Sequence, residues 1–192
     1  MDLVDVTLLV TRTLEEIGVA YAIGGSLASS LHGMPRATRD ADVVADLFPE
    51  HVLPLIDGLG GQFYVEESAV RQAIAARRSF NLIHLESMFK VDVFVSKGDD
   101  WSREQIRRRE RHTLGQATQE TAFFTAPEDT VLAKLRWFRE GGEASDRQWS
   151  DLVGVIKVQG PRFDRAYLSS WAERLGLADL AARAIRDADR ER

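Results

Sequence analysis

The stretch YAIGGSLASSLHGMPRATRDADVVAD, residues 21–46, decides the fold of this chain. Its first three residues form a short apolar run bounded by turn residues, which predicts a β-strand over 21–23. The turn Gly24-Gly25-Ser26 follows, and the small residues of 27–32 predict a short helix. The order of strand, glycine turn, short helix and second strand is much less common by chance than a glycine turn alone.

Two carboxylates begin the second predicted strand. Asp40 and Asp42 are two residues apart, so in a strand their side chains point to the same face, roughly 7 Å apart along the chain. Like charges so placed repel each other unless a cation lies between them. Carboxylate oxygens of this kind suit Mg²⁺, which also binds substrate phosphate. The pair therefore predicts a site for Mg²⁺, or for Mn²⁺ in its place.

The Gly-Gly-Ser turn predicts a phosphate-binding element. Glycines let backbone N–H groups approach a ligand without interference from a Cβ atom. The turn also leads into a helix N-terminus, whose unpaired N–H groups and dipole attract anions. We therefore expect Gly24, Gly25 and Ser26 to bind phosphate.

This arrangement resembles the nucleotidyltransferase superfamily typified by DNA polymerase beta. The superfamily pattern is hG[GS], a short helix, [DE]h[DE]h and one more carboxylate on a later strand. It is matched, in order and approximate spacing, by Gly24, Gly25, Ser26, Asp40, Ala41, Asp42 and Val43.

The wider stretch is similar to a small bacterial branch of that superfamily, which includes type IV abortive-infection toxins and antibiotic nucleotidyltransferases. In that branch a Gly-x-x-Arg-x-Thr-x-Asp segment precedes the metal-binding carboxylates. Here the segment consists of Gly33, Arg36, Thr38 and Asp40. The resemblance covers roughly residues 20–95, with a weaker similarity near 127–151.

The resemblance implies an α+β fold with a nucleotidyltransferase-like mixed β-sheet flanked by helices, followed by a helical C-terminal part. We expect residues 1–126 to form the α/β core and residues 127–192 to form helices packed on that core. Periodicity and turn residues agree. They predict strands at 62–65, 79–86, 89–95 and 117–126, and helices at 2–17, 68–78, 101–110, 127–139, 145–158, 164–175 and 177–189.

A third candidate carboxylate lies in the run FKVDVFV. Asp92 interrupts a β-branched strand pattern, and such local inconsistencies often mark functional sites. The superfamily has its third carboxylate on a strand of this kind, so the resemblance implies that Asp92 joins Asp40 and Asp42 as metal ligand and catalytic residue, on an adjacent strand. The alternative is that Asp92 pairs with Lys90 or another cation on an exposed face.

Three cationic residues complete the expected nucleotide site. Arg36 and Arg39 flank the carboxylate strand and are expected to neutralise phosphate charge, with structural ion pairing as the alternative. The segment PEDTVLAKLRWF resembles a helix that lies over the nucleotide in the small bacterial branch, which implies that Lys134 contacts the triphosphate. The alternative is a lysine whose stem borders an apolar stripe and whose ammonium reaches solvent.

Composition sets the outer bounds. Of 192 residues, 44% are hydrophobic and none is cysteine, which excludes thiolate catalysis and cysteine-ligated metals. No apolar run reaches the roughly 20 residues that span a bilayer, and the start lacks a signal-peptide pattern. We therefore expect no membrane partner and a cytoplasmic protein. The net charge of −5 disfavours extensive non-specific nucleic-acid binding.

The implied activity is Mg²⁺-dependent transfer of a nucleoside monophosphate from a nucleoside triphosphate such as ATP. The similarity to toxins of toxin–antitoxin pairs, and the arginines between 103 and 111, favour RNA or protein as the acceptor. One alternative is transfer to a small molecule, an antibiotic or a metabolite. Another is a catalytically weak nucleotide-binding or interaction module. The sequence leaves the acceptor, the choice of nucleotide and the oligomeric state open.

Overall fold

The computed structural model describes residues 1–114 and 120–190. The chain forms two compact units. We call Met1–Gly24 with Thr38–Phe124 the sheet unit, and Gly25–Ala37 with Thr125–Arg192 the helical unit. Residues 25–37 thus belong with the C-terminal helices. The expectation that residues 1–126 form the α/β core and residues 127–192 form helices packed on it stays a prediction.

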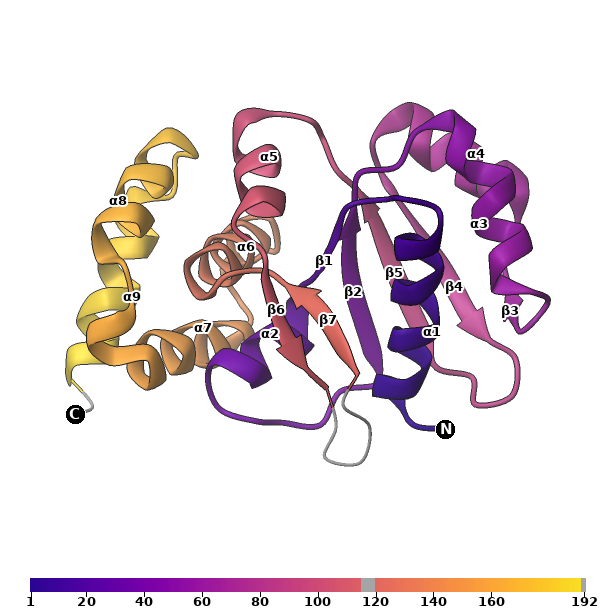
Figure 1. The fold of residues 1–192 in the computed structure, drawn as a ribbon. Helices are drawn as coiled ribbons and strands as arrows, with labels where there is room; N and C mark the ends of the chain where they lie inside the picture. The colour runs from indigo at the N-terminus through magenta and orange to yellow at the C-terminus, as the bar shows by residue number, and fades with distance from the viewer. Residues whose placement is uncertain (115–119, 191–192) are drawn as a thin grey trace. The chain divides into compact units, whose positions relative to one another are not determined.

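The sheet unit contains, among its described residues, a seven-stranded sheet with the order β3-β4-β5-β2-β1-β7-β6 (Figure 1). Pairs β2–β5 and β1–β7 are parallel and the other neighbours are antiparallel, so the sheet is mixed, as predicted. The strands are β1 (Tyr21–Ile23), β2 (Asp40–Ala45), β3 (Phe63–Tyr64), β4 (Ser79–His84), β5 (Lys90–Val95), β6 (Glu110–Thr113) and β7 (Thr121–Phe124).

Helices of the sheet unit cover one face of this sheet (Figure 1). Helix α1 (Leu3–Glu16) begins with a capping box between Asp2 and Asp5 and packs on β2 and β5. Helix α4 (Glu67–Ala76) packs on β4, and α3 (Val52–Leu59), which follows a single 3₁₀ turn, packs against both helices. The strands bury Val43, Val91 and Leu82 on their apolar face. The opposite face of β2 and β5 carries Asp40, Asp42, Lys90 and Asp92.

The helical unit is built from α2 (Gly25–His32), α6 (Pro127–Glu140), α7 (Asp146–Gln159), α8 (Arg165–Arg174) and α9 (Ala178–Arg190). Helix α2 packs against α6 and α7, and α9 packs against α7 and α8. At the end of α2, a Cβ atom on Gly33 would lie only 2.8 Å from the backbone nitrogen of Val155. Glycine at this position therefore lets α2 and α7 approach closely.

The predicted elements agree with the observed ones within a few residues, with one clear difference. The helix expected over 101–110 is α5 (Asp100–Arg107), and Glu110 instead begins strand β6, which pairs with β7. The guanidinium groups of Arg109 and Arg111 lie 4.5 and 4.4 Å from the centroid of the Phe123 ring in β7. The residues after α5 therefore contact β7 and do not continue the helix. Of the strand expected over 117–126, residues 117–119 lie outside the described residues.

Every helix within residues 1–114 and 120–190 is too short or too polar to cross a membrane.

Candidate active site

Strand β2 presents its two aspartates on one face of the sheet. Asp40 and Asp42 are partly exposed. Ala41, which lies between them, and Val43, which follows them, are buried. This alternation follows from the two-residue period of a strand. The burial of the small and β-branched residues therefore fixes both carboxylates on the opposite face, where they are accessible to a ligand.

Strand β5 brings the third carboxylate to the same face. It runs parallel to β2, and the register pairs Asp42 with Asp92 and Asp40 with Lys90. Neighbouring strands are roughly 4.8 Å apart, and Asp92 alternates with the buried Val91 and Val93. We call the surface formed by Asp40, Asp42, Asp92 and Lys90 the carboxylate face. The adjacency of the two strands is as the resemblance implied.

A hydrogen bond and an ion pair position side chains of the carboxylate face. The hydroxyl of Thr38 donates to Oδ1 of Asp40 at 2.9 Å, and the ammonium of Lys90 lies 2.7 Å from Oδ2 of Asp92. The hydrogen bond to Asp92 raises the pKa of Lys90, and the negative charges of Asp92, Asp40 and Asp42 act in the same direction. Lys90 is therefore a cation in the folded protein, and its pairing with Asp92 is the alternative that the sequence had left open.

The donor set fits a divalent cation. Three carboxylates on one face supply the hard oxygen ligands that Mg²⁺ and Mn²⁺ bind. The same three carboxylates raise the pKa of Lys90 through the hydrogen bond to Asp92 and through their charges. The sequence had named the three carboxylates and, as an alternative, a pairing of Asp92 with Lys90; the structure adds that Lys90 is also in register with Asp40 on the neighbouring strand.

The Gly-Gly-Ser turn has a defined backbone conformation. The N–H of Gly24 donates to the carbonyl oxygen of Asp42 at 2.8 Å, which ties the end of β1 to β2. Gly25 has φ of 54°, a left-handed conformation that is strained for residues with a Cβ atom. The hydroxyl of Ser26 accepts a hydrogen bond from Nη2 of Arg36 at 2.5 Å. The φ angle of Gly25 and the hydrogen bond of Ser26 give both residues a structural role. Contact of the turn with phosphate stays a prediction.

A buried ion cluster lies within the helical unit. Arg36 donates through Nε to Oδ1 of Asp151 at 2.9 Å and through Nη2 to Oδ2 at 2.9 Å. Lys134 donates to the same Oδ2 at 2.9 Å. The side chains of Asp151 and Lys134 are only 9% and 8% exposed. We call Arg36, Lys134, Asp151 and Ser26 the arginine–lysine cluster; its ionic groups carry a formal net charge of +1.

Hydrogen bonds keep Asp151 ionised in this cluster. Burial raises the pKa of Asp151, but hydrogen bonds from Arg36 and Lys134 lower it by more, so the net shift is downward. Lys134 is buried and paired, so its ammonium does not reach solvent as the alternative reading had it. The sequence left the role of Asp151 open, because its spacing from Asp146 departs from the pattern of the small bacterial branch. Its pairing with Arg36 and Lys134 joins segments that no local spacing relates.

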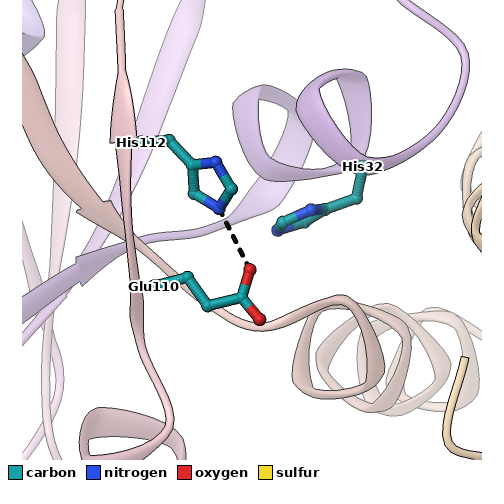
Figure 2. A group of neighbouring side chains, drawn as sticks. All are labelled: His32, Glu110 and His112. Atoms are coloured by element: carbon teal, nitrogen blue, oxygen red, sulfur yellow. Dashed lines mark hydrogen bonds and ion pairs between the residues drawn. The ribbon is translucent and has the colours of Figure 1, made fainter. Parts of the chain in front are cut away.

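Arginines of the segment from 103 to 111 have acidic neighbours within the sheet unit. Arg103 pairs with Asp100 at 2.7 Å and Arg107 with Glu104 at 2.7 Å. Arg111 lies 3.7 Å from Glu15. On the same strand, Nε2 of His112 lies 3.0 Å from a carboxylate oxygen of Glu110 (Figure 2). The positive charges of Arg103, Arg107 and Arg111 are therefore balanced by neighbouring carboxylates. Arg39, the other expected phosphate ligand, is exposed.

Comparison with known proteins gives matches in structure. No protein-family model matches this sequence, and no curated protein matches it. The solution structure of the antibiotic-resistance factor ANT(2'')-Ia aligns with a TM-score of 0.55 and 12% identity, over 95% of this chain and 99% of that chain. A crystal structure of an antigenic nucleotidyltransferase-like protein from Paracoccidioides brasiliensis aligns with a TM-score of 0.54 and 16% identity, over 94% and 92%.

The alignments extend over nearly the whole length of all three chains. The mixed sheet with its flanking helices, which the family resemblance had implied, is the fold in which this chain matches these structures. This chain therefore has a nucleotidyltransferase-like α+β fold, with structural resemblance to an antibiotic-resistance factor.

Proposed function

We propose that this protein is a nucleotidyltransferase that uses a divalent cation to transfer a nucleoside monophosphate from a nucleoside triphosphate. The observation that carries the proposal is the placement of Asp40, Asp42 and Asp92 on one face of two neighbouring parallel strands. The fold shared with nucleotidyltransferase-like proteins supports it. The three carboxylates would hold Mg²⁺, or Mn²⁺ in its place.

The chemistry places separate demands on these residues. A hydroxyl of the acceptor forms a bond to the α-phosphorus, the bond from that phosphorus to the bridging oxygen breaks, and pyrophosphate leaves. A bound divalent cation supplies charge stabilisation for the phosphoryl oxygens. Asp40 and Asp42 would hold the cation that accompanies the triphosphate. Asp92 would receive the proton of the attacking hydroxyl. Positioning and electrostatics account for most of the catalysis in this scheme.

Phosphate recognition is proposed for residues of the glycine turn and for three cations. The backbone N–H of Gly25 and the hydroxyl of Ser26 are assigned to the β- and γ-phosphates. Gly24, whose N–H is bonded to the carbonyl oxygen of Asp42, is assigned to the same turn because it has no side chain to block the approach of phosphate. Arg36 and Lys134 keep a net positive charge next to Ser26 after pairing with Asp151, which favours an anion. Arg39 is the third cation that we assign to phosphate binding.

Two classes of acceptor are candidates. RNA or protein was favoured by the arginine segment, but several of its arginines pair with acids of the sheet unit. The fold neighbour described as an antibiotic-resistance factor supports a small molecule equally well. A toxin-like macromolecular activity and a small-molecule activity therefore both enter the test.

The test uses each nucleoside triphosphate, labelled at the α-phosphate, with Mg²⁺ and cell extract or a panel of antibiotics. We expect label to move to an acceptor with the wild-type protein and with Asp46→Asn, and not with Asp42→Asn. Asp46 follows the same strand, and its carboxylate lies 3.8 Å from the guanidinium group of Arg77. Label in nuclease- or protease-sensitive bands identifies a macromolecular acceptor, and label in small products identifies the alternative. No transfer from any triphosphate contradicts the proposal and leaves a nucleotide-binding module.

A further inference from the structure

Lys90 is part of the carboxylate face itself. It lies two residues before Asp92 on β5 and in register with Asp40 on β2, so strand alternation directs it to the same side as all three carboxylates. Its ammonium is 2.7 Å from Oδ2 of Asp92, and its side chain is 40% exposed. A lysine ammonium is a point charge on a flexible stem. The contact with Asp92 can therefore form and break without any change in the backbone.

The charges on this face limit how many cations it holds. Three aspartates carry three negative charges, and Lys90 reduces the total to two. One divalent cation neutralises that remainder. A second divalent cation has to overcome the repulsion of both the first cation and the ammonium, unless the lysine leaves or new negative charge arrives.

We propose, on the basis of the proposed function, that Lys90 is a resident cation that excludes a second divalent cation from the carboxylate face until nucleotide binds. In the nucleotide-free protein Lys90 neutralises Asp92, and Asp40 and Asp42 bind a single divalent cation. The negative charge of a bound triphosphate then compensates for a second cation, which competes with Lys90 for Asp92. Lys90 thus couples occupancy of the metal site to the presence of nucleotide.

The experiment counts bound Mn²⁺ on nucleotide-free protein by electron paramagnetic resonance and by calorimetric titration. We expect one Mn²⁺ for the wild-type protein and two for Lys90→Met, with the first bound about tenfold more tightly because a positive charge a few ångströms away is removed. Lys97→Met is the matched control. It removes the same charge from an exposed lysine beyond the end of β5, and we expect wild-type count and affinity.

Two further variants keep the result decisive. Lys90→Arg retains the positive charge and should bind one Mn²⁺, whereas Lys90→Gln is neutral and replaces Lys90→Met if that variant does not fold. Equal Mn²⁺ count and affinity in the wild-type protein and the neutral variant, including no binding by either, overturns the inference. Because the readout is cation binding without turnover, it is independent of the label-transfer test of the proposed function.

Discussion

Asp42 and Asp92 are paired residues of the parallel strands β2 and β5, and they lie on the same face of the sheet. The residues on either side of each aspartate are buried against the helices. A shift of one residue in either strand would turn its aspartate toward the core. The hydrophobic pattern of the two strands therefore maintains the proximity of the two carboxylates.

Asp92→Asn should lower nucleotidyl transfer by at least about 100-fold, the lower range for loss of a general base. Binding of a non-hydrolysable triphosphate should change little, since Asp40 and Asp42 still hold the cation that accompanies it. Single-turnover transfer and calorimetric nucleotide binding measure the two effects. Asp57→Asn, on the exposed side of α3, is the control. Wild-type activity in Asp92→Asn would remove Asp92 from the mechanism.

Asp151→Asn should destabilise the helical unit. Loss of the carboxylate leaves the buried ammonium of Lys134 and the guanidinium of Arg36 without their common anion. Breaking a buried ion pair in this way costs about 3 kcal/mol, seen as a lower free energy of unfolding in urea. Asp146→Asn, an exposed position in the first turn of the same helix, should change it by less than about 0.5 kcal/mol. Equal stability of both variants would contradict a structural role for the arginine–lysine cluster.

Two glycine substitutions should have opposite effects. Gly33→Ala introduces a Cβ atom 2.8 Å from the nitrogen of Val155 and 2.9 Å from the carbonyl oxygen of Ser29. Both are backbone atoms, so we expect a loss of about 1–3 kcal/mol. At Gly154, in the middle of α7, the nearest atom is a flexible Met34 side-chain carbon at 3.5 Å. Gly154→Ala should therefore gain up to about 1 kcal/mol from helix propensity.

Thermal and urea unfolding of the two glycine variants provide the measurement. A neutral Gly33→Ala would show that α2 and α7 can separate without cost. The glycine of the Gly-x-x-Arg-x-Thr-x-Asp segment would then need an explanation other than packing.

Tyr21 should make stability fall at high pH. Burial raises its pKa from 10.0 to about 12, and the hydrogen bond to Glu15 acts in the same direction. Because the pKa of Tyr21 is higher in the folded state than in the unfolded state, the stabilisation that Tyr21 contributes is fully present below pH 10. It is lost as the pH rises toward 12. In that window Tyr21 lowers the free energy of unfolding by about 1.4 kcal/mol per pH unit. Tyr21→Phe should remove this slope and the tyrosinate absorbance step near 12, and an unchanged slope would contradict it.

The carboxylate strands were predictable because their signals are local. The alternation of Asp40 and Asp42 with apolar residues gives both the strand and its exposed face. The same reasoning found Asp92 and a strand for it. The pairing of β2 with β5 came from the family resemblance, since no sequence period specifies which strands become neighbours.

The features that could not be predicted depend on contacts between distant segments. Asp151 joins Arg36 to Lys134 across three separate parts of the chain, and none of the three positions has a local pattern that indicates the others. Strand β6 has no buried alternating face, so the sequence did not predict it, and the helix expected over 101–110 overlaps only its first residue. Its strand conformation depends on pairing with β7.

The discontinuous helical unit has a consequence for biosynthesis. Helix α2 leaves the ribosome well before α6 and α7, the helices that cover its buried residues Ala28, Ser29 and His32. Until Thr125 and the residues after it have been made, α2 has none of its native partners from those helices. An eight-residue helix is too short to be stable alone in water. The sheet unit, whose chain is complete at Phe124, can therefore fold during translation, whereas the helical unit, including α2, must assemble late.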